Sequence, residues 1–177
     1  MGGDGRPGPV YIDFPVDLQE ERVDAPNALA PRGRRRESLA LPSTQDIEAA
    51  AALLRTARRV LVIAGRGAGG AGQGLGEFLD HVDGLFLDSA ESKGLLPTDN
   101  ARYVPAVRGR AIREADLVIT LGRRLDFQLG YGSGAVFAPG ARFLRVGRSF
   151  AETGENRRGD VVDPCRRGGG AQGPGGR

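Results

Sequence analysis

Residues 59–70 read RVLVIAGRGAGG, a short apolar run that stops at glycine and arginine. Residues 115–126, ADLVITLGRRLD, repeat this pattern further along the chain. Apolar runs without polar alternation are typical of strands buried on both faces, and such strands belong to parallel sheets covered by helices. Glycine just after a strand lets the backbone turn sharply at the carboxyl edge, where open α/β sheets bind their ligands. The two runs therefore predict strands at 60–64 and 117–121.

Helical and strand patterns alternate around these two runs. Ser43 or Thr44 can cap a helix that continues with apolar residues at helical spacing: Ile47, Ala50, Ala51, Leu54 and Ala57. A second helix carries Leu75, Phe78, Leu79 and Val82, and a third is expected around 106–115. Short strands are expected at 85–88 and 143–146. Strands separated by helices of this length predict an α/β fold with a doubly wound, Rossmann-like parallel sheet.

The two ends of the chain have a different character from the middle. Residues 9–14 are expected to form a short strand. It must pair with a sheet supplied from elsewhere, because a lone strand cannot satisfy its backbone hydrogen bonds. Residues 24–42 are rich in proline and arginine and read as a linker. Residues 162–177 lack apolar periodicity and are expected to be disordered. The predicted organisation is thus an N-terminal segment 1–23, a linker 24–42, an α/β domain 43–161 and a tail 162–177.

Composition excludes several classes of protein. Of 25 basic residues only Lys93 is a lysine, and the arginines are scattered among acids while aromatic residues are 6% of the chain, so no nucleic-acid partner is expected. The single cysteine, Cys165, excludes an internal disulfide and fits a reducing compartment. Neither a membrane-spanning stretch nor a signal peptide is visible, so we expect a cytoplasmic protein without membrane contact.

The glycine-rich loop after the first strand is the strongest candidate binding feature. It contains Gly65-x-Gly67-x-x-Gly70 between a predicted strand and a predicted helix. Backbone N–H groups and a helix N-terminus in this context can cradle a diphosphate. No acidic residue stands in a clear ribose-binding role at the end of the second strand unless Asp88 serves. The alternative is a purely structural turn in a glycine-rich chain.

Charged residues at the second strand end offer a further site. Arg123 or Arg124 could bind a phosphate or a partner carboxylate, or could form a solvated pair with Asp126 that contributes little. The other plausible acid–base groups are His81, Glu91 and Lys93. They form no constellation of nucleophile, base and acid, and the chain has no Cys/His spacing typical of a metal site. We therefore assign no catalytic residue.

Four segments follow one another in a diagnostic order. They are GPVYIDFPVD at residues 8–17, the run and glycine turn at 58–67, KGLLP at 93–97, and the strand ending in Gly-x-Arg-x-Asp at 115–126. In this order they resemble the central domain of thiamine-diphosphate-dependent enzymes of the acetolactate synthase type. Residues 8–17 resemble the last strand of that family's N-terminal pyrimidine-binding domain. KGLLP is closest to the branch with 2-hydroxyacyl-CoA lyase and oxalyl-CoA decarboxylase, and the likeness runs to about Asp160.

The resemblance implies that this chain is a fragment of a three-domain enzyme. In the family, an N-terminal glutamate activates the cofactor and a C-terminal domain holds Mg²⁺ and the diphosphate, so thiamine diphosphate and Mg²⁺ would bind outside this chain. The missing N- and C-terminal domains are then its partners, and the full-length form would be a homo-oligomer. The tail after Val161 replaces the family's closing strand and helix, as a frameshift would produce.

A nucleotide role is also implied by the resemblance. The central domain of some members binds FAD or ADP at the carboxyl edge of its sheet, and by motif position this role falls to Gly65, Gly67 and Arg124. One departure concerns residues 146–149, VGRS, where the family often has Ile-Asp-x-Asp with an acid near the adenosine.

We therefore expect the central domain of a carboligase or decarboxylase that cleaves or forms a carbon–carbon bond beside a 2-keto or 2-hydroxyacyl group, inactive by itself. The alternatives are a stand-alone FAD- or ADP-binding module and a non-catalytic dimerisation scaffold.

Overall fold

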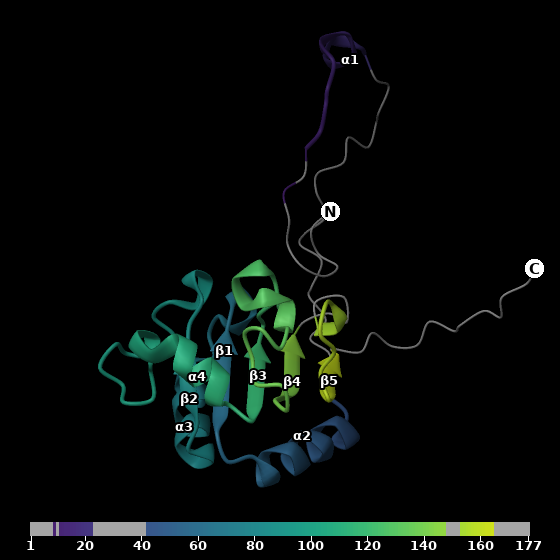
Figure 1. The fold of residues 1–177 in the computed structure, drawn as a ribbon. Coiled ribbons are helices and arrows are strands. Elements are labelled where there is room, and N and C mark those ends of the chain that lie inside the picture. The colour runs from purple at the N-terminus through teal and green to yellow at the C-terminus, as the bar shows by residue number, and fades with distance from the viewer. Residues whose placement is uncertain (1–8, 10, 23–41, 148–152, 165–177) are drawn as a thin grey trace, which may run out of the picture. The chain divides into compact units, whose positions relative to one another are not determined.

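The computed structural model describes residues 9, 11–22, 42–147 and 153–164, without the side chains of 162–164 (Figure 1). The chain divides into two compact units, residues 1–39 and 40–177. None of the helices in the described ranges has the length and apolar character needed to cross a membrane.

The first unit contains one short described helix, α1 (Val16–Glu20), which begins after Pro15. The strand predicted at residues 9–14 is wrong for this structure, because Pro9 and residues 11–14 form neither helix nor strand and Val10 lies outside the described residues. Tyr11, Ile12 and Phe14 are 90%, 77% and 60% exposed. An extended segment gains its backbone hydrogen bonds only from a neighbouring strand, and here the apolar side chains face solvent.

The second unit is built on one parallel sheet. Its strands are β1 (Val60–Ala64), β2 (Leu85–Leu87), β3 (Leu117–Leu121), β4 (Arg142–Gly147) and β5 (Val161–Pro164). They pair in the order β2-β1-β3-β4-β5, and every pairing is parallel. All residues of β1 are buried, as its apolar run predicts. The doubly wound α/β fold is confirmed.

Helices cover both faces of the sheet. The α-helices of this unit are α2 (Thr44–Thr56), α3 (Gly72–Val82) and α4 (Arg108–Glu114). Apolar residues of α2 and α3 pack with Val60 and Val62 on one face, while Ala111 and Ile112 of α4 pack with Leu61 and Ile63 on the other. Alternate residues of a strand point to opposite faces, so β1 contributes to both cores. The helices expected from the sequence are confirmed.

The start of α2 shows how local chemistry sets an element boundary. Ser43 precedes the helix in an extended conformation, and its hydroxyl oxygen accepts a hydrogen bond of 3.1 Å from the backbone N–H of Asp46. This bond satisfies one of the N–H groups that a helix leaves without an internal partner. Short 3₁₀ turns occur at Arg66–Ala68, Ala90–Ser92, Pro105–Val107 and Phe127–Gly132.

The last strand corrects the expected boundary of the α/β domain. Residues 162–164 were assigned to a disordered tail, but they continue β5, which pairs with β4 from Leu144 opposite Val161 to Gly147 opposite Pro164. Asp160 begins the pairing, because its carboxylate accepts from the N–H of Phe143 at 2.6 Å and its own N–H donates to the Phe143 carbonyl at 2.8 Å. Four residues are too few to show periodicity, so only the neighbouring strand reveals this one. The rest of the predicted tail, 165–177, lies outside the described residues.

The strand order defines where a ligand would be expected. From β1 the chain passes to β2 on one side, and then returns to β3 on the other side of β1 (Figure 1). The connections therefore leave the carboxyl ends of β1 and β3 in opposite directions. In an open sheet with this 2-1-3-4-5 order, the crevice outside those two strand ends is the usual ligand position.

Candidate functional site

The loops after β1 and β3 touch backbone to backbone at this switch point. The N–H of Gly65 donates to the Leu121 carbonyl at 2.9 Å, and that of Gly67 donates to the Gly122 carbonyl at 3.2 Å. A Cβ at Gly65 would lie 2.5 Å from the Gly122 carbonyl oxygen, and a Cβ at Gly122 would lie 2.4 Å from the Gly67 Cα. Gly65, Gly67 and Gly122 are therefore required by close packing. We call them the inner glycines.

The rest of the loop is open. A Cβ at Gly70 or Gly74 would meet no atom within 4 Å, and Gly70 has a positive φ of 84°. Helix α3 begins at Gly72 without a side-chain cap and without an acidic residue in its first turn. The first turn of a helix presents N–H groups without internal partners, and its dipole favours an anion there. Gly70 and Gly74, the outer glycines, thus leave open the part of the loop and of the first turn of α3 that is suited to a diphosphate.

The segment after β2 closes one side of the site. The hydroxyl of Ser92 is buried and donates to the Ala64 carbonyl at 2.8 Å, while the N–H of Ser89 donates to the same oxygen at 3.1 Å. Ser89 and Ser92 also form a reciprocal capping box around the Ala90–Ser92 turn. Sequence reasoning missed Ser92, because a capping box is recognised by Ser or Thr followed three residues later by Glu or Gln, and here a second serine takes that place.

Asp88, the candidate ribose contact, is partly buried at the end of β2. Burial raises the pKa of the neighbouring Tyr103 hydroxyl, and its hydrogen bond to Asp88 raises it further. KGLLP packs nearby, because a Cβ at Gly72 would lie 2.6 Å from the Leu95 carbonyl oxygen.

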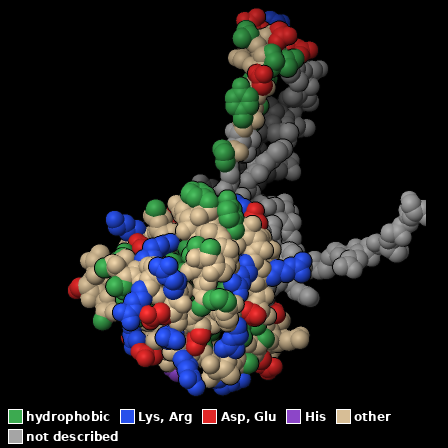
Figure 2. Space-filling model, viewed as in Figure 1, with side chains coloured by type: hydrophobic (Ala, Val, Ile, Leu, Met, Phe, Trp, Pro, Cys, Tyr) green, Lys and Arg blue, Asp and Glu red, His purple; other side chains and the backbone are tan. Residues whose placement is uncertain are grey.

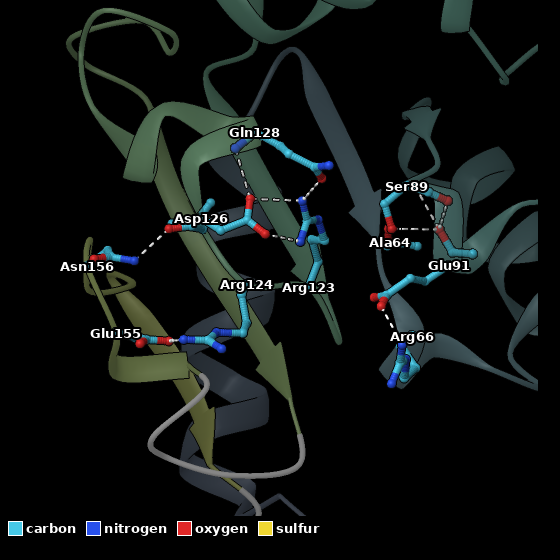
Figure 3. A network of polar contacts seen from close by, with 12 residues as sticks. Ala64, Arg66, Ser89, Glu91, Arg123, Arg124, Asp126, Gln128, Glu155 and Asn156 are labelled. Carbon is cyan, nitrogen blue, oxygen red and sulfur yellow. Dashed lines mark hydrogen bonds and ion pairs between the residues drawn. The ribbon is translucent and has the colours of Figure 1, made fainter. Parts of the chain in front are cut away.

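Three arginines at this edge are each paired with an acid (Figure 3). Arg66 donates to Glu91 at 2.7 Å, and Arg124 pairs with Glu155. Figure 3 shows these two pairs on opposite sides of the view, with the Arg123 guanidinium turned toward Asp126 and Gln128. The local charge is largely neutralised within the protein.

Arg123 and Arg124 differ in what they can do. Arg123 is 8% exposed and donates to both carboxylate oxygens of Asp126, at 2.7 and 3.0 Å, and to the Gln128 side chain at 2.7 Å. Burial alone would raise the pKa of Asp126, but the bonds and charge of Arg123 outweigh it and lower that pKa. This pair is not a solvated one. The side chain of Arg124 is 38% exposed and remains within reach of a ligand.

Glu155, the partner of Arg124, is held by residues that sequence reasoning missed. Arg145 of β4 is fully buried, and its Nη1 donates to the carbonyls of Glu155 and Arg157, each at 2.7 Å. Asn156, with a positive φ of 62°, donates to the Leu125 carbonyl at 2.6 Å. No signal in the sequence could have shown these contacts, because they join segments that are ten or more residues apart and lack a motif.

The other acid–base candidates are not brought together. His81 lies in the last turn of α3, which runs from the carboxyl edge toward the amino edge of the sheet, and Lys93 is exposed. Glu91 is bound to Arg66. Within the described ranges, no group of three or more His, Cys, Asp or Glu side chains could share a metal ion. His81, Glu91 and Lys93 therefore do not fit a Mg²⁺–diphosphate site, and no step of thiamine chemistry is assigned to them.

Comparison with known proteins decides the family. Residues 47–163 match the family model described as the central domain of thiamine pyrophosphate enzymes. The chain belongs to the thiamine pyrophosphate enzyme family. The resemblance found in the order of the sequence motifs is thereby confirmed, and the matched range covers the whole described sheet except Pro164.

Curated relatives of this thiamine pyrophosphate enzyme domain include lyases and a decarboxylase. The chain is 33% identical over 162 residues to 2-hydroxyacyl-CoA lyase 1 of Dictyostelium discoideum, covering 89% of this chain and 28% of the relative. It is 28% identical to the human 2-hydroxyacyl-CoA lyase 1, covering 86% and 27%. For oxalyl-CoA decarboxylase of Escherichia coli strain K12 the identity is 30%, covering 86% and 28%. The chain thus spans just over a quarter of the length of these relatives.

Proposed function

We propose that this chain is the structural central domain of a thiamine-diphosphate-dependent lyase or decarboxylase that acts on acyl-CoA substrates. The observation that carries the proposal is the family match over residues 47–163 together with curated relatives that are lyases and a decarboxylase of CoA thioesters. The alignment with the Dictyostelium lyase covers 89% of this chain, which is more than residues 47–177 make up. The likeness to that lyase therefore extends to residues before the family match begins at residue 47.

In this proposal the chain supplies no catalytic group. The Mg²⁺-binding and cofactor-activating residues would lie in other domains of the complete enzyme, which are then the partners of this domain. The exposed Tyr11, Ile12 and Phe14 support this assignment, because apolar side chains of this size are normally covered by a partner surface.

The test is an activity assay of the purified chain with thiamine diphosphate and Mg²⁺. A 2-hydroxyacyl-CoA, oxalyl-CoA and pyruvate are offered separately, and the products of carbon–carbon cleavage are measured. We expect no turnover above a reaction without protein. Turnover of any of the three, removed by omitting thiamine diphosphate, would show that the chain is a catalyst by itself.

A second role, the binding of a nucleoside diphosphate group such as that of ADP or FAD, is favoured by the strand order. The carboxyl ends of β1 and β3 form the switch point of a 2-1-3-4-5 sheet, where phosphate-bearing ligands usually bind. The first turn of α3 would hold the diphosphate through its backbone N–H groups, and Arg124 would donate from the opposite loop. Gly65 and Gly67 would shape the floor, because their own N–H groups already bond to β3.

Calorimetric titration with ADP and with FAD tests this role. Arg124→Gln is expected to weaken ADP binding about tenfold, as loss of a charge-assisted hydrogen bond does. Glu155→Gln is expected to strengthen it, because the carboxylate competes with the ligand for Arg124. Arg110→Gln is the matched control, since Arg110 is paired with Glu114 on α4. No heat with wild-type protein at high micromolar ligand would overturn the nucleotide role and leave the structural role intact.

A further inference from the structure

A groove of about 400 Å³ lies at the opposite edge of the sheet from the glycine loop. It is lined by the first residues of β1 and β2, by the turn between α3 and β2, and by residues of α4. We call it the amino-edge groove. Its volume falls in the range of small-molecule sites, which is about 300–1,000 Å³.

The floor of the amino-edge groove is aliphatic. Leu61 and Ala111 belong to the buried core beneath α4, and both line the groove. Leu85 and Val107 also line it, but they are 36% and 49% exposed. No aromatic side chain is among the lining residues, so the groove offers no stacking surface for a nucleobase. An aliphatic chain would cover the two exposed side chains and gain hydrophobic burial.

The rim of the groove is charged, and most of its charges are paired. Arg110 donates to Glu114 at 2.7 Å, and Arg59 approaches the same carboxylate at 3.9 Å. The hydrogen bond from Arg110 lowers the pKa of Glu114, which is therefore ionised at neutral pH. Arg102 is bound by Asp83 and, at 3.4 Å, by Asp80. Figure 2 shows the same pattern on a wider scale, with blue and red side chains side by side over the lower part of the second unit.

Arg58 is the exception on this rim. Its backbone N–H donates to the Asp116 carboxylate at 2.9 Å, which fixes the start of β1. Its side chain is exposed, and among the described residues no hydrogen bond or ion pair engages its guanidinium group. Four arginines and two acids line the groove, so the positive charge exceeds the negative charge by two. A guanidinium without a partner at the mouth of an aliphatic groove suits an anionic headgroup.

We propose that the amino-edge groove binds an organic anion with an aliphatic body, whose carboxylate or phosphate end is held by Arg58 while the chain lies on Leu85 and Val107. This site is separate from the proposed nucleotide edge, and it does not depend on the assignment of that edge.

The experiment is an NMR titration of the methyl-labelled full chain with octanoate and, separately, octyl phosphate. The methyl signals of Leu85 and Val107 report on the groove, and octanol serves as the uncharged control of equal length. We expect these methyls to shift with at least one of the anions, and octanol to bind at least tenfold more weakly. Whichever anion binds more tightly identifies the headgroup.

Two variants separate the headgroup contact from general apolar binding. Arg58→Gln is expected to weaken binding of the anion about tenfold, the usual size of a charge-assisted contact, without changing the weak binding of octanol. Arg55→Gln is the matched control, because Arg55 is an exposed arginine in the last turn of α2 and does not line the groove. The proposal is overturned if neither anion shifts the two methyls, if octanol binds equally well, or if Arg58→Gln binds as wild type does.

Discussion

The glycines that follow β1 serve two different purposes, although the first of them fit a single sequence pattern, Gly65-x-Gly67-x-x-Gly70. At Gly65 and Gly67 a side chain would collide with the backbone after β3, whereas at Gly70 and Gly74 it would extend into open space. The inner glycines let the backbones of the loops after β1 and β3 contact each other at the carboxyl ends of these strands. The outer glycines leave an unobstructed surface before and within the first turn of α3. A Gly-x-Gly-x-x-Gly motif therefore combines packing positions with positions accessible to a ligand.

The largest effect is expected from Gly122→Ala. Gly122 has a φ of 55°, and an added Cβ would lie 2.4 Å from the Gly67 Cα and 2.5 Å from its carbonyl carbon. The strained conformation and the overpacking together should lower the free energy of unfolding by about 3–5 kcal/mol. Urea unfolding measures this loss, with Gly140→Ala as control because a Cβ there meets no atom within 4 Å. A Gly122→Ala variant as stable as the control would disprove the role of the inner contact.

Gly65→Ala isolates the close approach from backbone strain. Gly65 has a φ of −130°, which any residue can adopt, so the methyl group is opposed only by close contacts, at 2.5 Å with the Gly122 carbonyl oxygen and at 2.9 Å with the Arg123 Cα. We expect a loss of about 2 kcal/mol in unfolding free energy, from overpacking alone. The same urea experiment checks it, and a loss larger than that of Gly122→Ala would contradict this ranking.

Asp126 provides a pH-dependent contribution at the same edge. Its pKa lies below the ordinary value of 3.8 because Arg123 stabilises the carboxylate. A lowered pKa in the folded state gives stability that is present above about pH 4 and is lost as pH falls through the folded-state value. Asp126→Asn should therefore cost about 1.5 kcal/mol at pH 7, from weaker bonds to a buried arginine. The difference from wild type should shrink toward pH 3, as measured by urea unfolding across this range; a constant difference would rule out ionisation as its cause.

The smallest stability effect, with opposite sign, is expected at Gly74 in the first turn of α3. Gly74→Ala should raise the unfolding free energy by about 0.5 kcal/mol, because alanine loses less backbone entropy in a helix. The added methyl group would lie in the helical turn that is proposed to hold the diphosphate, so ADP affinity should fall several-fold at the same time. Thermal unfolding and calorimetry on one sample test both. Increased stability with unchanged ADP affinity would argue against a diphosphate at the first turn of α3.

The sequence was sufficient for the parallel sheet because β1 and β3 are continuous apolar runs, which bury both faces. It was insufficient for β5, whose four residues become a strand through pairing with β4. It misjudged residues 9–14, where β propensity exists without a neighbouring strand among the described residues. The position of the candidate residues was predictable, whereas their nucleotide role stays a prediction. Gly65, Gly67 and Arg124 do lie at the switch point, but the buried Arg145 and the Glu155 that pairs with Arg124 depend on contacts that no local pattern encodes.

Amide hydrogen exchange by NMR, with and without ADP, tests the division of the loop most directly. Without nucleotide, the N–H groups of Gly65 and Gly67 should exchange slowly because they are bonded to β3, and those of Gly72 and Gly74 should exchange fast. Added ADP should slow exchange at Gly72 and Gly74 and leave Gly65 and Gly67 unchanged. Fast exchange at Gly65 and Gly67, or ADP protection that appears there and not at the first turn of α3, would contradict the account.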